Sequence, residues 1–200
     1  MSNNYRRCAG AIVFNKDGCV FLGKRIGIDG AWQFPQGGIE ENESIEKASQ
    51  RELFEETGLS SVTLIHSETT PIRYTFPKTI QERMAKRGRT FAGQDIFFSL
   101  FYFNGKDDEI NLLTDEQEFD EYKWGDFDFA INNIIDFKKD VYISIANKFS
   151  PLIFHALKIF ETHNHFLKRQ RLLLPEWNDS YDTGFPGHLR YFHRTFDVAL

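Results

Sequence analysis

Short apolar runs separated by turn-forming residues dominate the first half of the chain, and they predict β-strands. Cys8–Phe14 and Val20–Gly23 flank the sequence Asn-Lys-Asp-Gly, which is typical of a hairpin turn. Further strands are predicted at Val62–His66, Ile72–Phe76, Ile96–Phe103 and Glu121–Trp124.

Helical periodicity alternates with these runs. The segment Asn42–Thr57 has apolar residues at helical spacing, either Asn42 or Ser44 as its N-cap, and Gly58 where a left-handed residue would end it. Later helices are predicted at Ile131–Ile135, Val141–Lys148 and Pro151–Arg171. Strands interleaved with helices predict an α/β or α+β domain, in which helices cover a mixed sheet.

The first predicted helix carries three carboxylates on one face. Glu52, Glu55 and Glu56 are spaced i, i+3 and i+4, which stacks them within about 5–6 Å of one another at Cβ. Like charges at this spacing destabilise a helix, and a hard divalent cation such as Mg²⁺ or Mn²⁺ would offset the repulsion. The alternative to a metal site is an acidic helix face that is simply exposed to solvent.

The acidic helix belongs to a longer pattern with fixed spacing. Gly37 is followed six residues later by Glu43, and then by Arg51-Glu52-Leu53, Glu55-Glu56, Gly58 and Leu59. These nine positions resemble, without a departure, the box that defines the Nudix hydrolases. The resemblance implies a Nudix α/β/α sandwich with a mixed sheet. It also implies an enzyme that hydrolyses a nucleoside diphosphate linked to another group.

The resemblance also implies roles for the residues of the box. Glu52, Glu55 and Glu56 would hold the metal together with the backbone carbonyl of Gln36, and Glu52 would take the proton from the attacking water. Three further residues would support the loop and the helix without binding metal themselves: Gly37, Glu43 and Arg51.

Residues outside the box resemble one branch of the family, the bacterial RNA pyrophosphohydrolases and the related asymmetric diadenosine-tetraphosphate hydrolases. The matching segments, which follow in that branch's order between residues 5 and 157, are Tyr5-Arg6, Trp32–Ile39, Arg73-Tyr74, Pro77-Lys78, Gly93-Gln94, Glu118-Phe119-Asp120 ahead of Trp124, and Phe137–Tyr142. This resemblance implies 5′-triphosphorylated RNA, and hence a role in mRNA decay, or a dinucleoside polyphosphate as substrate.

The same branch suggests roles for six residues beyond the box. Glu118 would be an additional metal ligand or base, and its alternative is a surface acid in an acidic run. The residues expected to contact substrate are Arg6 and Arg25 at the phosphates, Phe137 and Lys138 at a base, and Tyr74 lining the same cleft. Core packing is the alternative for Phe137, because the chain contains 21 phenylalanines.

The charge distribution changes what the net charge of −5 implies. An acidic chain at first argues against a nucleic-acid partner. Residues 36–59, however, hold 7 acidic and 2 basic residues, an excess that bound cations would offset. The segment Lys78–Arg89 holds five basic residues and one acid, and is either a solvated loop or a loop that steers phosphate into the cleft.

The remaining features favour a cytoplasmic enzyme that does not associate with membranes. The chain has no signal-like apolar segment, and its two cysteines, Cys8 and Cys19, make no disulfide framework. We expect a hydrolase domain at residues 1–157 and a helical C-terminal extension of unknown role at 158–200. A catalytically inactive module that binds nucleotides or RNA ends is a third functional hypothesis, disfavoured by the intact carboxylates. The sequence leaves the oligomeric state open.

Overall fold

The structure is a computed structural model that describes residues 4–28, 30–115 and 117–173, with side chains described up to residue 163. The chain divides into two compact units, Met1–Pro151 and Leu152–Leu200. All residues of the predicted site belong to the first unit.

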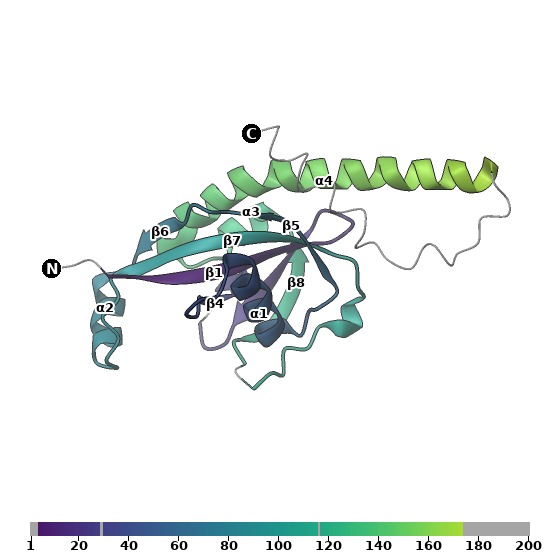
Figure 1. Cartoon of the computed structure of the whole chain (residues 1–200). Helices are drawn as coiled ribbons and strands as arrows, with labels where there is room; N and C mark the ends of the chain where they lie inside the picture. The colour runs from purple at the N-terminus through teal and green to yellow at the C-terminus, as the bar shows by residue number, and fades with distance from the viewer. Residues whose placement is uncertain (1–3, 29, 116, 174–200) are drawn as a thin grey trace. The chain divides into compact units, whose positions relative to one another are not determined.

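An eight-stranded mixed sheet forms the centre of the first unit (Figure 1). Its main path runs in the order β3-β2-β1-β7-β5, while β4 pairs with β1, β6 with β7, and β8 with β2. The β1–β7 pair is parallel and the other pairs are antiparallel. The strands are β1 (Tyr5–Phe14), β2 (Val20–Arg25), β3 (Trp32–Gln33), β4 (Gln36–Gly38), β5 (Val62–Ser67), β6 (Ile72–Thr75), β7 (Gly93–Phe103) and β8 (Phe119–Gly125).

The described residues also form four α-helices: α1 (Ile45–Thr57), α2 (Lys78–Ala85), α3 (Phe127–Asn132) and α4 (Lys139–Leu173). Short 3₁₀ turns span Asp107–Glu109 and Asp136–Lys138. In the described part of the chain, no helix is both long enough and apolar enough to cross a membrane.

Three predictions about helices are wrong. The predicted break before Pro151 is absent, because α4 continues through this proline; the loss of one N–H and the ring's clash with the preceding turn do not end the helix here. The helix predicted at Ile131–Ile135 begins earlier, where the side chain of Asp126 accepts a hydrogen bond from the N–H of Phe129. The basic segment Lys78–Arg89 was expected to be a loop, yet its first eight residues form α2.

The ends of α1 follow from local sequence. The Ser44 hydroxyl accepts a hydrogen bond from the N–H of Lys47 at 3.3 Å, so Ser44 and not Asn42 is the cap. Gly58 ends the helix with φ of 72°, a left-handed conformation that glycine adopts without steric cost. The helix that carries the acidic face therefore begins and ends within one residue or so of where its capping residues predict.

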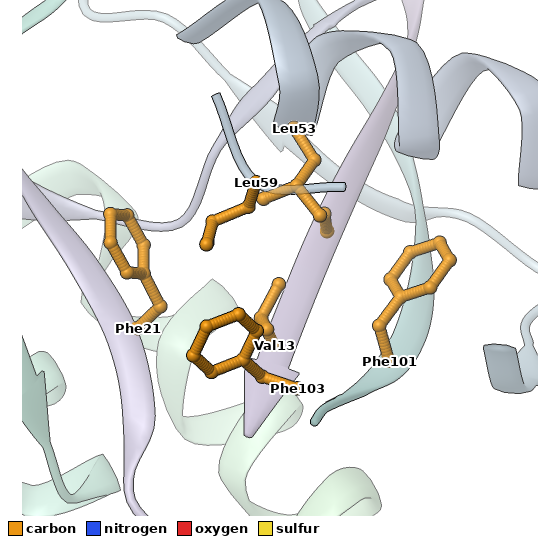
Figure 2. Close-up of a cluster of buried hydrophobic side chains, with 7 residues drawn as sticks. Val13, Phe21, Leu53, Leu59, Phe101 and Phe103 are labelled. Atoms are coloured by element: carbon orange, nitrogen blue, oxygen red, sulfur yellow. The ribbon is translucent and has the colours of Figure 1, made fainter. Parts of the chain in front are cut away.

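Alternating residues of β7 face two different helices. Phe101 and Phe103 pack with Leu53 of α1 and with Val13 in a buried cluster on one face (Figure 2). Phe98 points to the other face, where its ring lies 6.4 Å from Phe149 of α4. The first part of α4, up to Pro151, thus covers one face of the sheet and α1 covers the other, which gives three layers.

Candidate active site at the acidic helix

A short strand brings the start of the box against α1. In β4, Gln36 and Gly38 pair with β1, and the N–H of Gln36 donates to Glu56 Oε2 at 3.1 Å. A Cβ added at Gly37 would lie 1.9 Å from Glu52 Oε2. Only glycine therefore allows the Glu52 carboxylate to lie directly against this strand.

Arg51 connects the loop before α1 to the carboxylates on it. Its Nε and Nη2 donate to the two oxygens of Glu43 at 2.9 and 3.0 Å, and Nη2 also donates to the carbonyl of Gly38 at 2.8 Å. Its Nη1 donates to Glu52 and to Glu55, both at 2.8 Å. One guanidinium thus holds three carboxylates and one carbonyl in fixed relative positions.

The carboxylates of α1 differ in their exposure. Glu56 is buried, and this burial raises its pKa well above the usual range against the opposing hydrogen bond from Gln36. Burial also raises the pKa of Glu52, while the neighbouring Arg51 lowers it. The side chain of Glu55 is 52% exposed. One buried and one half-buried carboxylate beside an exposed third make ionisation costly without further positive charge.

This arrangement suits a divalent cation by the chemistry of its donors. The clustered groups are carboxylate and carbonyl oxygens, which hard cations prefer, and the absence of a side chain at Gly37 lets the Glu52 carboxylate lie against β4. In the described residues, no three acidic, histidine or cysteine side chains already converge on one point. Instead Arg51 holds Glu52 and Glu55, and Gln36 holds Glu56.

Glu118 lies near the cluster and pairs with a predicted phosphate-binding residue. Its carboxylate is 2.7 Å from Arg25 Nη2, and its charge acts on Glu56. The neighbouring Lys24 forms an ion pair with Glu121. Arg25 ends β2 and Glu118 immediately precedes β8, so this ion pair joins the ends of two neighbouring strands.

Arg6 lies next to Gly38 of β4. A Cβ at Gly38 would be 2.5 Å from Arg6 Nη2, so the guanidinium rests against the β4 backbone. Its charge lowers the pKa of Glu52. Strand register aligns Arg6 with Gln94 of β7 and Gln94 with Tyr74 of β6, in one row across three strands.

Three aromatic side chains gather at the end of this row. The Phe137 ring centroid is 6.0 Å from that of Tyr74 and 6.5 Å from that of Phe76. The Tyr74 hydroxyl donates to Gln94 Oε1 at 2.5 Å. Tyr74 and Phe76 are buried and Phe137 is half-buried. Sequence reasoning missed Phe76, although its position two residues after Tyr74 in a predicted strand places it on the same face.

Lys138 links the aromatic cluster to the carboxylates. It is only 5% exposed, and burial, together with the charge of Arg25, lowers its pKa to about 8. The charges of Glu56 and Glu118 oppose this change. Its Nζ lies 5.4 Å from the centroid of the Tyr74 ring. Lys138, the cation expected beside Phe137, is thus buried against Tyr74, and its charge interacts with that of Glu56 in the box.

The layered fold and the box on α1 together define a Nudix hydrolase. The sequence profile of the NUDIX domain matches residues 4–143, so the chain belongs to the Nudix family. Nudix hydrolases generally use divalent metals such as Mg²⁺.

Curated relatives cover the same part of the chain. An RNA pyrophosphohydrolase of Wolbachia pipientis subsp. Culex pipiens is 39% identical over 150 residues, which are 74% of this chain and 91% of the relative. An RNA pyrophosphohydrolase of Coxiella burnetii is 38% identical over 152 residues, 74% of this chain and 66% of the relative. Chloroplastic Nudix hydrolase 26 of Arabidopsis thaliana is 39% identical over 150 residues, 73% of this chain and 69% of the relative.

Solved structures share the fold at lower identity. The E. coli dihydroneopterin triphosphate pyrophosphohydrolase is 20% identical with a TM-score of 0.53, over 72% of this chain and 97% of that structure. A C. elegans Ap4A hydrolase is 18% identical with a TM-score of 0.52, over 71% of this chain and 96% of that structure. These matches confirm the predicted Nudix fold with its mixed sheet.

Proposed function

We propose that this Nudix hydrolase removes pyrophosphate from the 5′-triphosphate end of RNA, using Mg²⁺ or Mn²⁺. The observation that carries the proposal is the cluster of Tyr74, Phe76 and Phe137 next to Lys138, whose charge interacts with Glu56 and Glu118. A stacked terminal base on this cluster would leave its triphosphate directed at the carboxylates. The names of the Wolbachia and Coxiella relatives give independent support.

The residues that would hold the divalent ion are those of the acidic helix and its surroundings: the carboxylates of Glu52, Glu55, Glu56 and Glu118, and the carbonyl of Gln36. When bound, the ion would neutralise negative charge on the phosphate oxygens. The pattern of contacts around Arg51 supports a role for Arg51 and Glu43 in keeping these donors aligned, and Gly37 gives Glu52 its place.

The side chains of the protein would perform the remaining steps. Glu52 would take a proton from water while the water oxygen bonds to phosphorus and the bridging P–O bond breaks, leaving a 5′-monophosphate and pyrophosphate. Burial raises the pKa of Glu52, which makes its carboxylate a stronger base. Arg6 and Arg25 would bind the phosphate oxygens, and Arg25 would exchange its partner Glu118 for substrate.

An asymmetric diadenosine polyphosphate hydrolase is the second candidate, because such substrates offer the same combination of a base and a phosphate chain. The third, an inactive module that binds nucleotides or RNA ends, would have no need for clustered carboxylates whose burial raises their pKa.

Parallel assays distinguish the three functions. We would incubate the wild type, Glu55→Gln and the control Glu41→Gln with Mg²⁺ and either a short 5′-triphosphate RNA or diadenosine tetraphosphate. Glu41 is an exposed acid in the loop before α1, so its replacement makes the same charge change away from the cluster. We expect faster turnover of the RNA, and a loss of about 100-fold or more in Glu55→Gln only. Faster turnover of the dinucleotide would favour the second function, and no metal-dependent turnover would favour the third.

A further inference from the structure

Helix α2 and the turn after it present an array of positive charge that the proposed chemistry does not use. Five exposed basic residues lie within twelve positions: Lys78, Arg83, Lys86, Arg87 and Arg89. Glu82 is the one acid among them. In the described part of the chain, no ion pair joins these five residues to a carboxylate, whereas Arg25, Arg51 and Arg73 each have an acidic partner.

One side of α2 attaches it to the domain, which directs the charges outward. Gln81 Nε2 donates to the carbonyl of Phe76 at 2.7 Å, and Ile80 and Met84 are half-buried at helical spacing with it. No residue of α2 is fully buried. The helix α2 therefore lies on the surface, and its charged side chains face solvent.

The position of α2 follows directly from the aromatic cluster. The helix begins two residues after Phe76, with only Pro77 between them, and Phe76 contacts Phe137. The N–H of Phe76 also bonds to the carbonyl of Ala92, just before β7. Figure 1 shows α2 beside the start of β1. α2 therefore begins directly next to the aromatic cluster.

We propose that α2 and its following turn bind the sugar-phosphate backbone of single-stranded RNA downstream of the 5′-terminal nucleotides. This inference rests on the proposed function, because it assumes that the terminal nucleotide occupies the aromatic cluster. The eight-residue helix is about 12 Å long, which matches a run of backbone phosphates more closely than one phosphate group. Such binding would depend on charge and not on sequence, and would favour long RNA over dinucleotides.

The test compares two triple variants with the same charge change. The first is Lys86→Gln, Arg87→Gln and Arg89→Gln, in and after the turn that ends α2. The control is Lys16→Gln, Lys106→Gln and Lys123→Gln, three exposed lysines elsewhere on the first unit. For a triphosphate RNA of about 20 nucleotides, we expect kcat/KM of the first variant to fall by about tenfold, mainly through KM, and that of the control by less than about twofold. On a triphosphate dinucleotide both variants should match the wild type.

Binding gives a second measurement that does not require turnover. Fluorescence anisotropy would follow a 5′-monophosphate RNA of the same length across a series of salt concentrations. For the first variant, the slope of log Kd against log salt should fall by about 2, because three contacts with a single strand are lost. An unchanged Kd and slope would overturn the inference even if the enzyme processes RNA. Equal losses on the dinucleotide and the long RNA would overturn it too. A third outcome separates the two proposals: the variant loses RNA binding, but the wild type does not turn RNA over. This result would refute the proposed function and would still support α2 as an RNA-binding surface.

Discussion

The backbone of Gly37 lies directly against the carboxylate of Glu52, so closely that a Cβ at position 37 would be 1.9 Å from Oε2. Glu52 is also one of the carboxylates held by Arg51. The strand before α1 and the acidic face of α1 therefore fit together through a contact that no residue except glycine permits. This contact explains why the first residue of the box is a glycine.

Replacing Gly37 by alanine should therefore displace Glu52. We expect kcat to fall by about 100-fold, since small misplacements of a catalytic group have effects of this size. Gly38→Ala is the comparison, because its Cβ would meet Arg6, a proposed phosphate-binding residue, and should therefore change KM more than kcat. Steady-state kinetics on triphosphate RNA would measure both variants, and equal losses of kcat would argue against the special position of Gly37.

The donor geometry of Arg51 predicts that lysine cannot replace it. A lysine ammonium lacks the planar fork that reaches Glu43, Glu52 and Glu55 together. Arg51→Lys should lose about 10–100-fold in activity and bind the activating metal more weakly. Gln50→Lys places the same new side chain at the adjacent exposed position and should behave as wild type. Wild-type metal affinity and activity in Arg51→Lys would contradict the aligning role.

The pH dependence of stability should reveal the buried carboxylate Glu56. Because its pKa is raised in the folded state, the folded protein binds more protons than the unfolded chain between the ordinary value of 4.5 and the raised one. Without metal, its contribution should make the free energy of unfolding fall as pH rises from about 4.5 through this window.

Glu56→Gln removes this titration, so its stability should decline less steeply with pH than that of the wild type. Urea unfolding in the presence of a chelator, between about pH 5 and 6.5, would measure the two slopes below the range where Lys138 titrates. Glu41→Gln, which changes an exposed acid, should retain the wild-type slope. Identical slopes in all three proteins would refute the assigned burial effect.

Phe137 should affect substrate binding more than chemistry. Stacking of a base on an aromatic ring contributes about 1–3 kcal/mol, so Phe137→Leu should raise KM for triphosphate RNA by about tenfold and change kcat little. Phe137→Trp keeps an aromatic face and should restore binding. A drop in stability with no change in KM for Phe137→Leu would assign this residue to the core.

The sequence predicted the parts of the fold that local rules determine. Ser44 and Gly58 set the limits of α1, and apolar runs predicted the long strands β1 and β7. The short strands β3 and β4 escaped prediction because two or three residues carry no periodicity. The continuous α4 escaped it because one proline outweighed the helical pattern on both sides.

The candidate site shows the same contrast. The spacing of Glu52, Glu55 and Glu56 could be read from the sequence because they share one helix. In the structure, the charges of Arg6, Arg25, Glu118 and Lys138 act on Glu52 or Glu56. Contacts between distant segments were not visible, such as the support of Phe137 by Phe76 and the burial of Lys138 against Tyr74. These depend on how β6 and the turn before α4 pack together, which no local pattern encodes.

A competition assay tests the central claim most directly. Triphosphate RNA and diadenosine tetraphosphate at equal concentrations would be mixed with the full chain and Mg²⁺ in one tube, and the decay of both substrates followed together. The ratio of their rates gives the ratio of kcat/KM values without separate calibrations. We predict that the RNA is converted to its 5′-monophosphate first, with release of pyrophosphate. Consumption of the dinucleotide first, or of both at the same rate, would contradict the proposed function.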